Sequence, residues 1–189
     1  HGVFRRQRQM CIRDSYEHWL EQPEVLQKFA IHAETGEPMP RDLLKRMLGA
    51  ANFDMGFQTV EYIASALVDL KFHEGPAPVD IMARQAEILS EINMPSAIGM
   101  RHATPQFAHV FAGDGYSSAY YSYMWSEVMD ADAFASFESL GGAFDPERAQ
   151  SLHDCILSKG GSEDAEQLYL AFRGRMPDAS ALLKNRGLD

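Results

Sequence analysis

Apolar residues recur every three or four positions along most of the chain from residue 16 onward. This spacing places them on one face of a helix, because an α-helix completes a turn in about 3.6 residues. In the segment 41–53, Leu43, Leu44, Met47 and Leu48 share such a face, and the segment 57–72 is apolar enough to be buried. Nothing in the chain alternates convincingly between apolar and polar residues over five or more positions. The pattern therefore predicts an all-α fold.

Proline, glycine and acidic residues indicate where the predicted helices begin and end. Pro23 suits the first turn of a helix, and Asp145-Pro146-Glu147 is typical of an N-cap followed by proline at the first helical position. The acidic run 162–166 suits the positive end of another helix, which we expect to reach Phe172. The same reasoning predicts further helices at 79–92, 124–137 and 146–158. It also predicts a linker at 75–78 and a loop at 93–105.

Composition and charge narrow the functional classes. The chain has 189 residues, enough to bury a core as one domain or as a piece of a larger protein, and its formal net charge is −10. A nucleic-acid partner is not expected, because phosphate binding needs a basic excess. A membrane span is not expected either, because no apolar run approaches about eighteen residues. Cys11 and Cys155 show no disulfide framework, so we expect the protein to be located in the cytoplasm. We expect the side chains of Asp130 and Asp132 to be solvated.

The first fifteen residues differ from the rest of the sequence. The chain begins with histidine instead of methionine, and the run 5–15 has no apolar periodicity and resembles a translated sequencing adapter. A solvated basic arm is the alternative interpretation. We therefore treat residues 1–15 as a truncated or artefactual leader and base the fold on residues 16–189.

The segment 107–125, FAHVFAGDGYSSAYYSYMW, carries the candidate chemistry. Gly113 and Gly115 permit a tight turn, and a helix after that turn would place Tyr116, Tyr120 and Tyr123 on one face. Phenol hydroxyls in a row near His109 can donate hydrogen bonds to a peptide carbonyl that becomes an oxyanion during acyl transfer. The alternative is a packing stripe of aromatic rings whose hydroxyls are satisfied by the backbone.

The segment resembles the signature of the M3 family of zinc oligopeptidases, the thimet oligopeptidase, oligopeptidase A and peptidyl-dipeptidase group. The family pattern His-x-Phe-x-Gly-Gly-Tyr-x-x-x-Tyr-Tyr-x-Tyr-x-Trp is matched from His109 to Trp125, with Asp114 as one additional residue between the glycines. A second stretch, 156–188, is similar to the terminal pattern of the same family. The resemblance covers residues 16–189 and identifies them as the C-terminal part of the catalytic domain.

The resemblance implies an enzyme that hydrolyses short peptides with one Zn²⁺ per full-length chain. HGVF at the start of the sequence looks like the continuation of the family's HExxH zinc motif, and no ligand motif lies between Gly2 and Glu17. The metal ligands are then outside this chain or missing from it, so no residue here is assigned to the metal and the fragment is expected to be inactive alone.

The resemblance also implies the roles of the site residues. Tyr116 and Tyr123 would be catalytic and bind the oxyanion, whereas His109, Tyr120 and the two glycines, Gly113 and Gly115, would bind the peptide. Cleavage within peptides and release of dipeptides both remain open, as does the oligomeric state. The alternative function is that of a non-catalytic helical binding or scaffold module.

Overall fold

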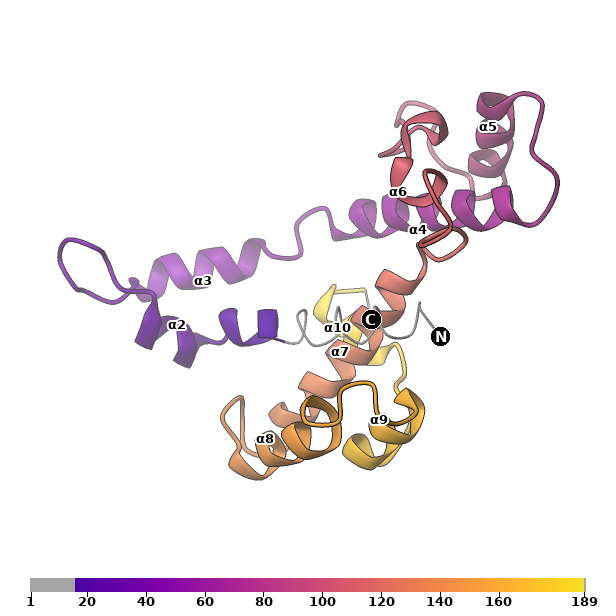
Figure 1. Cartoon of the computed structure of the whole chain (residues 1–189). Coiled ribbons are helices and arrows are strands. Elements are labelled where there is room, and N and C mark those ends of the chain that lie inside the picture. Colours follow the sequence, from indigo (N-terminus) through magenta and orange to yellow (C-terminus); the bar gives the residue numbers. More distant parts are fainter. Residues whose placement is uncertain (1–15, 189) are drawn as a thin grey trace. The chain divides into compact units, whose positions relative to one another are not determined.

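The computed structural model describes residues 16–188, and the interpretation of residues 1–15 as a leader lies outside these. The described residues form helices joined by turns and loops, with an isolated antiparallel bridge between Ile31 and Pro38 (Figure 1). The prediction of an all-α fold is confirmed. The described chain divides into two compact units, a first unit of residues 54–125 and a second unit of residues 16–53 with 126–188.

The first unit is built on a long helix from the apolar segment 57–72. The sequence predicts this segment to be buried; its later part is, whereas Phe57, Val60 and Ile63 are exposed. This helix is α4, Met55–His73, and it packs against α5, Ile81–Glu91. Helix α5 begins where the side chain of Asp80 accepts a hydrogen bond from the N–H of Ala83 at 2.9 Å. The 3₁₀ helix η1, Thr104–Gln106, and the short helix α6, Ala108–Phe111, then lead to the turn that carries the tyrosines.

The second unit contains most of helix α7, Ser122–Glu138, with shorter helices before and after it in the sequence. Residues 16–20 are helical, and the indole of Trp19 meets the rings of Phe134 and Phe137 edge-on. The other helical elements of this unit are α2, Pro23–Phe29; α3, Arg41–Ala50; α8, Pro146–Leu152; the π-helix η2, His153–Leu157; α9, Ala165–Arg173; and α10, Ser180–Asn185.

The helix boundaries of the second unit follow the local signals in the sequence. Pro23 is the first residue of α2, and the side chain of Asp145 accepts a hydrogen bond from the N–H of Arg148 at 2.7 Å at the start of α8. Asp164 caps α9 in the same way. The predicted helix 146–158 differs in its second half, because its residues from His153 to Leu157 form a π-helix.

The prediction that Asp130 and Asp132 are solvated is wrong. Helix α7 is covered on more than one side within the second unit, so two of its acidic residues are buried together with apolar ones. The Oδ2 atom of Asp130 lies 3.0 Å from Nε2 of His18. Asp132 is buried against α9, where its carboxylate meets the side chains of Tyr169 and Arg173.

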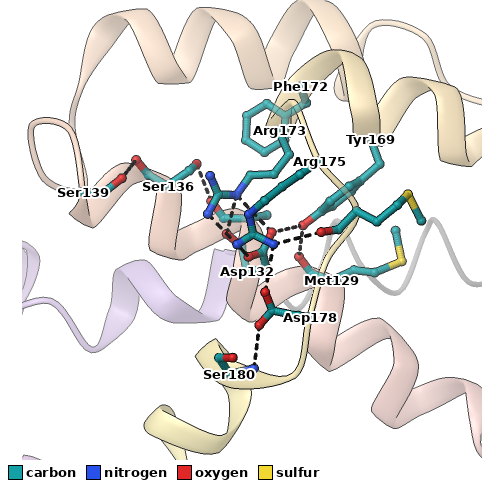
Figure 2. Close-up of polar contacts among 12 residues, drawn as sticks. Met129, Asp132, Ser136, Ser139, Tyr169, Phe172, Arg173, Arg175, Asp178 and Ser180 are labelled. Carbon is teal, nitrogen blue, oxygen red and sulfur yellow. Dashed lines mark hydrogen bonds and ion pairs between the residues drawn. The ribbon is translucent and has the colours of Figure 1, made fainter.

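Figure 2 shows that the carboxylate of Asp132 accepts hydrogen bonds from side chains of the C-terminal part of the chain. Its Oδ2 accepts hydrogen bonds from the hydroxyl of Tyr169 at 2.7 Å and from Nε of Arg173 at 3.0 Å, and its Oδ1 pairs with Arg175. Arg175 also pairs with Asp178 at 3.1 Å. A buried carboxylate is tolerated when charged partners and hydrogen bonds satisfy it, as they do here.

Candidate functional site

The candidate site lies in the turn between α6 and α7. Residues 112–121 form consecutive turns and bends, and α7 begins only at Ser122. The helix on which a common face of the three tyrosines would depend begins at Ser122, and not near Tyr116. A common helix face cannot be what brings Tyr116, Tyr120 and Tyr123 together, since the first two lie in the turn.

The three predicted tyrosine side chains meet around His109. Its imidazole stacks on the ring of Tyr116 with centroids 4.4 Å apart, and it meets the ring of Tyr120 edge-on at 5.9 Å. Its Nε2 atom lies 2.7 Å from the hydroxyl of Tyr123, and the rings of Tyr120 and Tyr123 are 5.3 Å apart. We call His109, Tyr116, Tyr120 and Tyr123 the tyrosine cluster. The short helix α6 supplies its histidine, whereas the turn and the first turn of α7 supply its phenols.

The contact between His109 and Tyr123 determines which hydrogen-bond donors the cluster offers. In the tautomer that carries its proton on Nε2, His109 donates to the Tyr123 oxygen, and the hydroxyl keeps its own proton for another acceptor. In the other tautomer, Tyr123 donates to His109. His109 is exposed, so solvent can exchange with either arrangement.

The surroundings of Tyr120 make its phenol less acidic. Partial burial raises the pKa of its hydroxyl above the usual value, and the carboxylate of Glu61 adds to the effect while the cation of Arg101 opposes it. A raised pKa keeps the phenol protonated at neutral pH. Tyr120 is therefore available as a hydrogen-bond donor at neutral pH.

Gly113 and Gly115 both lie exposed in the turn, but Gly113 does not use the conformational freedom of glycine. Its φ is not in the left-handed region, and a side chain added there would meet no atom within 4 Å. The left-handed residue of this turn is Ser118, with φ of 56°. The substrate-binding role of the two glycines stays a prediction, and the open space at Gly113 is compatible with close approach of a ligand.

Two side chains of α4 support the turn and were not singled out from the sequence. The carboxylate of Asp69 accepts hydrogen bonds from the backbone N–H groups of Ser118 and Tyr120, both at 2.9 Å. The hydroxyl of Tyr62 donates to the carbonyl oxygen of Tyr120 and accepts from the N–H of Met124. The available signal was Asp69 itself, since a charged residue inside an apolar helix needs a buried partner.

The described residues do not fit a zinc centre. Within residues 16–188, no group of three or more histidine, cysteine, aspartate or glutamate side chains is arranged to hold a metal ion. Among the helices of the same residues, none has the length and apolar character needed to cross a bilayer.

The residues that the resemblance singles out, a histidine of α6 and three phenols of the turn and of α7, therefore lie together on a helical scaffold. Comparison with known proteins agrees, because the model of peptidase family M3 matches residues 14–188. The chain belongs to peptidase family M3.

Curated relatives with two different names match the chain at similar identity. Oligopeptidase A of Escherichia coli (strain K12) is 38% identical over 178 residues, which cover 91% of this chain and 25% of that protein. Dipeptidyl carboxypeptidase of Salmonella typhimurium is 36% identical over 178 residues, covering 92% of this chain and 26% of that protein. Dipeptidyl carboxypeptidase of Escherichia coli is 33% identical over 207 residues, covering all of this chain and 30% of that protein. The chain thus spans about a quarter of the length of these relatives.

Proposed function

We propose that this chain is the C-terminal part of a zinc peptidase that hydrolyses short peptides, and that it supplies the hydrogen-bond donors facing the scissile bond. The observation that carries the proposal is the tyrosine cluster, in which the residues of the family signature converge on His109. We propose the cytoplasm as its place of action, because its cysteines show no disulfide framework.

The roles within the cluster follow from its donors. Tyr116 and Tyr123 are the catalytic residues of the proposal, and their hydroxyls stabilise the negative charge that develops on the carbonyl oxygen of the substrate. Tyr120 and His109 orient the peptide backbone beside the turn of Gly113 and Gly115. Since the described residues hold no metal-ligand set, the zinc ligands belong to another part of the protein, and the chain alone is inactive in this proposal.

The hydroxyl contacts favour this role over the alternative of a binding or scaffold module. In such a module the phenols would be packing residues with hydroxyls bound to the backbone, as the hydroxyls of Tyr62 and Tyr169 are. The hydroxyl of Tyr123 meets the ring nitrogen of His109, an exposed side chain that can exchange partners. This arrangement supports a donor role for Tyr123.

The proposal is tested by Tyr123→Phe and Tyr116→Phe in the full-length peptidase that contains residues 16–188. Each change removes one hydroxyl and keeps the ring, so packing is retained. If the hydroxyl donates only in the transition state, kcat falls by about a hundredfold or more while KM for a short peptide changes little. Tyr121→Phe is the matched control, because Tyr121 lies in the same turn with 47% of its surface exposed and outside the cluster.

Two results decide against the catalytic role. Turnover within a few-fold of the unchanged enzyme in both variants would make the tyrosines packing residues. A drop of the same size in Tyr121→Phe would show that the turn tolerates no loss of a hydroxyl, whatever its position.

A further inference from the structure

We propose that Asp69, assisted by Tyr62, is a positioning residue that fixes the turn of residues 117–121 in the shape that aligns the tyrosine cluster. This inference rests on the proposed function, because it concerns the residue that sets the geometry of the proposed donors. Asp69 lies in the middle of an apolar helix, touches no substrate atom in this assignment and acts through the backbone of the turn.

The carboxylate of Asp69 binds the turn at two points. Oδ1 accepts the hydrogen bond from the N–H of Ser118 and Oδ2 accepts the one from the N–H of Tyr120, each at 2.9 Å. The side chain is fully buried, with 0% of its surface exposed, so water does not compete for these bonds. Because Ser118 is in the left-handed conformation, which L residues seldom adopt, the turn needs such an external partner to keep its shape.

Tyr62 holds the same turn from the carbonyl side. Its hydroxyl donates to the carbonyl oxygen of Tyr120 and accepts from the N–H of Met124 at 3.1 Å. Its ring stacks on the ring of Tyr120 with centroids 5.3 Å apart and an interplanar angle of 24°. Tyr120 is therefore bound through its N–H, its carbonyl and its ring by two residues that lie two turns apart on α4 and share a face of that helix.

The same helix also contacts the element that carries the histidine of the cluster. The Nδ1 atom of His73 lies 2.7 Å from the carbonyl oxygen of Asp69 and 3.1 Å from its Oδ1 atom. The imidazole of His73 stacks on the ring of Phe111 in α6, with centroids 5.4 Å apart. Because α6 also carries His109, α4 acts as one rigid frame for both halves of the tyrosine cluster.

The geometry distinguishes positioning from simple stabilisation. A carboxylate offers two acceptor oxygens, whereas the amide of asparagine offers one oxygen and one NH₂ group that cannot accept a hydrogen bond. Asp69→Asn therefore keeps the size of the side chain but releases one of the two backbone N–H groups. The released half of the turn moves the Tyr120 ring and its neighbours, and a displacement of about 1 Å can lower a rate by about a hundredfold.

The experiment measures Asp69→Asn in the full-length peptidase by steady-state kinetics per folded molecule and by hydrogen exchange of the segment 112–124. We expect kcat to fall by about tenfold to a hundredfold, with KM within about threefold. We expect the amides of Ser118 and Tyr120 to exchange at least about tenfold faster. The matched control is Asp132→Asn, the same substitution at a buried aspartate of the second unit, for which we expect unchanged kcat and unchanged exchange in this segment.

A milder pair keeps the test decisive if Asp69→Asn does not fold. Tyr62→Phe removes the hydroxyl that is hydrogen-bonded to Tyr120 and keeps the stacked ring. Tyr169→Phe is its control, because the hydroxyl of Tyr169 also binds a backbone carbonyl and one further group. Tyr62→Phe is expected to lower kcat and speed exchange in the same segment, by smaller factors than Asp69→Asn. Tyr169→Phe is expected to change neither.

If Asp69 acts through the tyrosines, the effects of Asp69→Asn and of the tyrosine substitutions on kcat are not additive. In the Tyr116→Phe/Tyr123→Phe background, we expect Asp69→Asn to lower kcat by far less than it does alone. An undiminished effect there, or normal kcat in Asp69→Asn and Tyr62→Phe, overturns the inference.

The outcome also separates this inference from the proposed function. If Tyr116→Phe and Tyr123→Phe are inactive while the Asp69 and Tyr62 variants are fully active, the positioning role fails and the catalytic role stands. If the tyrosine variants are fully active, the proposed function fails, and the positioning role fails with it even where the exchange data show that Asp69 holds the turn.

Discussion

Asp69 in the first unit and Asp132 in the second are both buried carboxylates on long helices, yet they bind different partners. Asp69 accepts hydrogen bonds from two backbone N–H groups of a turn. Asp132 accepts them from the side chains of Tyr169 and Arg173 and pairs with Arg175. Backbone donors fix the path of the chain, whereas side-chain cations hold neighbouring elements together. The first carboxylate therefore shapes the candidate site, and the second stabilises the C-terminal part of the chain.

The largest expected effect on stability is at Asp132. Asp132→Asn leaves Arg173 and Arg175 without their common carboxylate, and removing one partner of a buried ion pair costs about 3–5 kcal/mol. Because 46% of the Arg175 side chain is exposed, we expect the lower end, about 3 kcal/mol, in the free energy of unfolding measured with urea. Asp178→Asn, at the exposed end of the same network, is the control and should change little. A loss of unfolding free energy in Asp132→Asn as small as that in Asp178→Asn would contradict the stabilising role assigned to Asp132, since the buried carboxylate would then not hold the network.

A smaller effect is expected at Tyr169. Burial raises the pKa of its hydroxyl, and the hydrogen bond to the carboxylate of Asp132 raises it further, so the phenol stays protonated and donates to that carboxylate. Tyr169→Phe removes a hydrogen bond to a charged group, which is worth about 1.5–3 kcal/mol. Thermal unfolding should show this loss while kcat per folded molecule stays the same. Lost turnover in Tyr169→Phe would contradict the division of roles between Asp69 and Asp132.

The smallest expected effect is a pH dependence of stability in the second unit, which comes from the ion pair of His18 and Asp130. Burial lowers the pKa of the His18 imidazole, but its hydrogen bond to Asp130 and the charges of Asp130, Glu21 and Glu138 outweigh this, so the pKa is raised in the folded protein. A raised pKa means that the folded state binds the proton more tightly than the unfolded state.

The stabilisation by His18 is therefore full below about pH 6.5, the usual value for histidine, and is lost as the pH rises through the folded-state pKa. A series of Tm values against pH should fall across this window, and His18→Gln should flatten that part of the curve. An equal slope in His18→Gln would assign the pH dependence to other groups.

Local signals in the sequence predicted much of the fold. The apolar spacing indicated the helices, and Pro23, Asp145 and Asp164 lie at the starts of α2, α8 and α9, as their residue types suggest. The residues of the tyrosine cluster were predictable because they lie within one short stretch. Their contacts with His109 then follow from the compact turn.

The supports of the cluster depend on contacts between distant positions, which local patterns do not encode. Asp69 and Tyr62 lie 49 and 58 residues before the groups of the turn that they bind first. These bonds also explain why residues 116–121 are not helical, since Asp69 takes N–H groups that a helix would use and Ser118 is left-handed. Asp130 and Asp132 were expected to be solvated because their partners, His18 and Arg173, are likewise far away in the sequence.

The central claim is that the phenols of the cluster bind the oxyanion more strongly than the substrate carbonyl. Its most direct test is the inhibition constant of a short peptide with a tetrahedral phosphinate at the scissile position, measured with the unchanged peptidase, Tyr116→Phe and Tyr123→Phe. Because such a compound mimics the transition state, we expect its inhibition constant to rise by the same factor as kcat/KM falls, about a hundredfold, while KM stays nearly constant. An inhibition constant that is unchanged in both variants would contradict the claim.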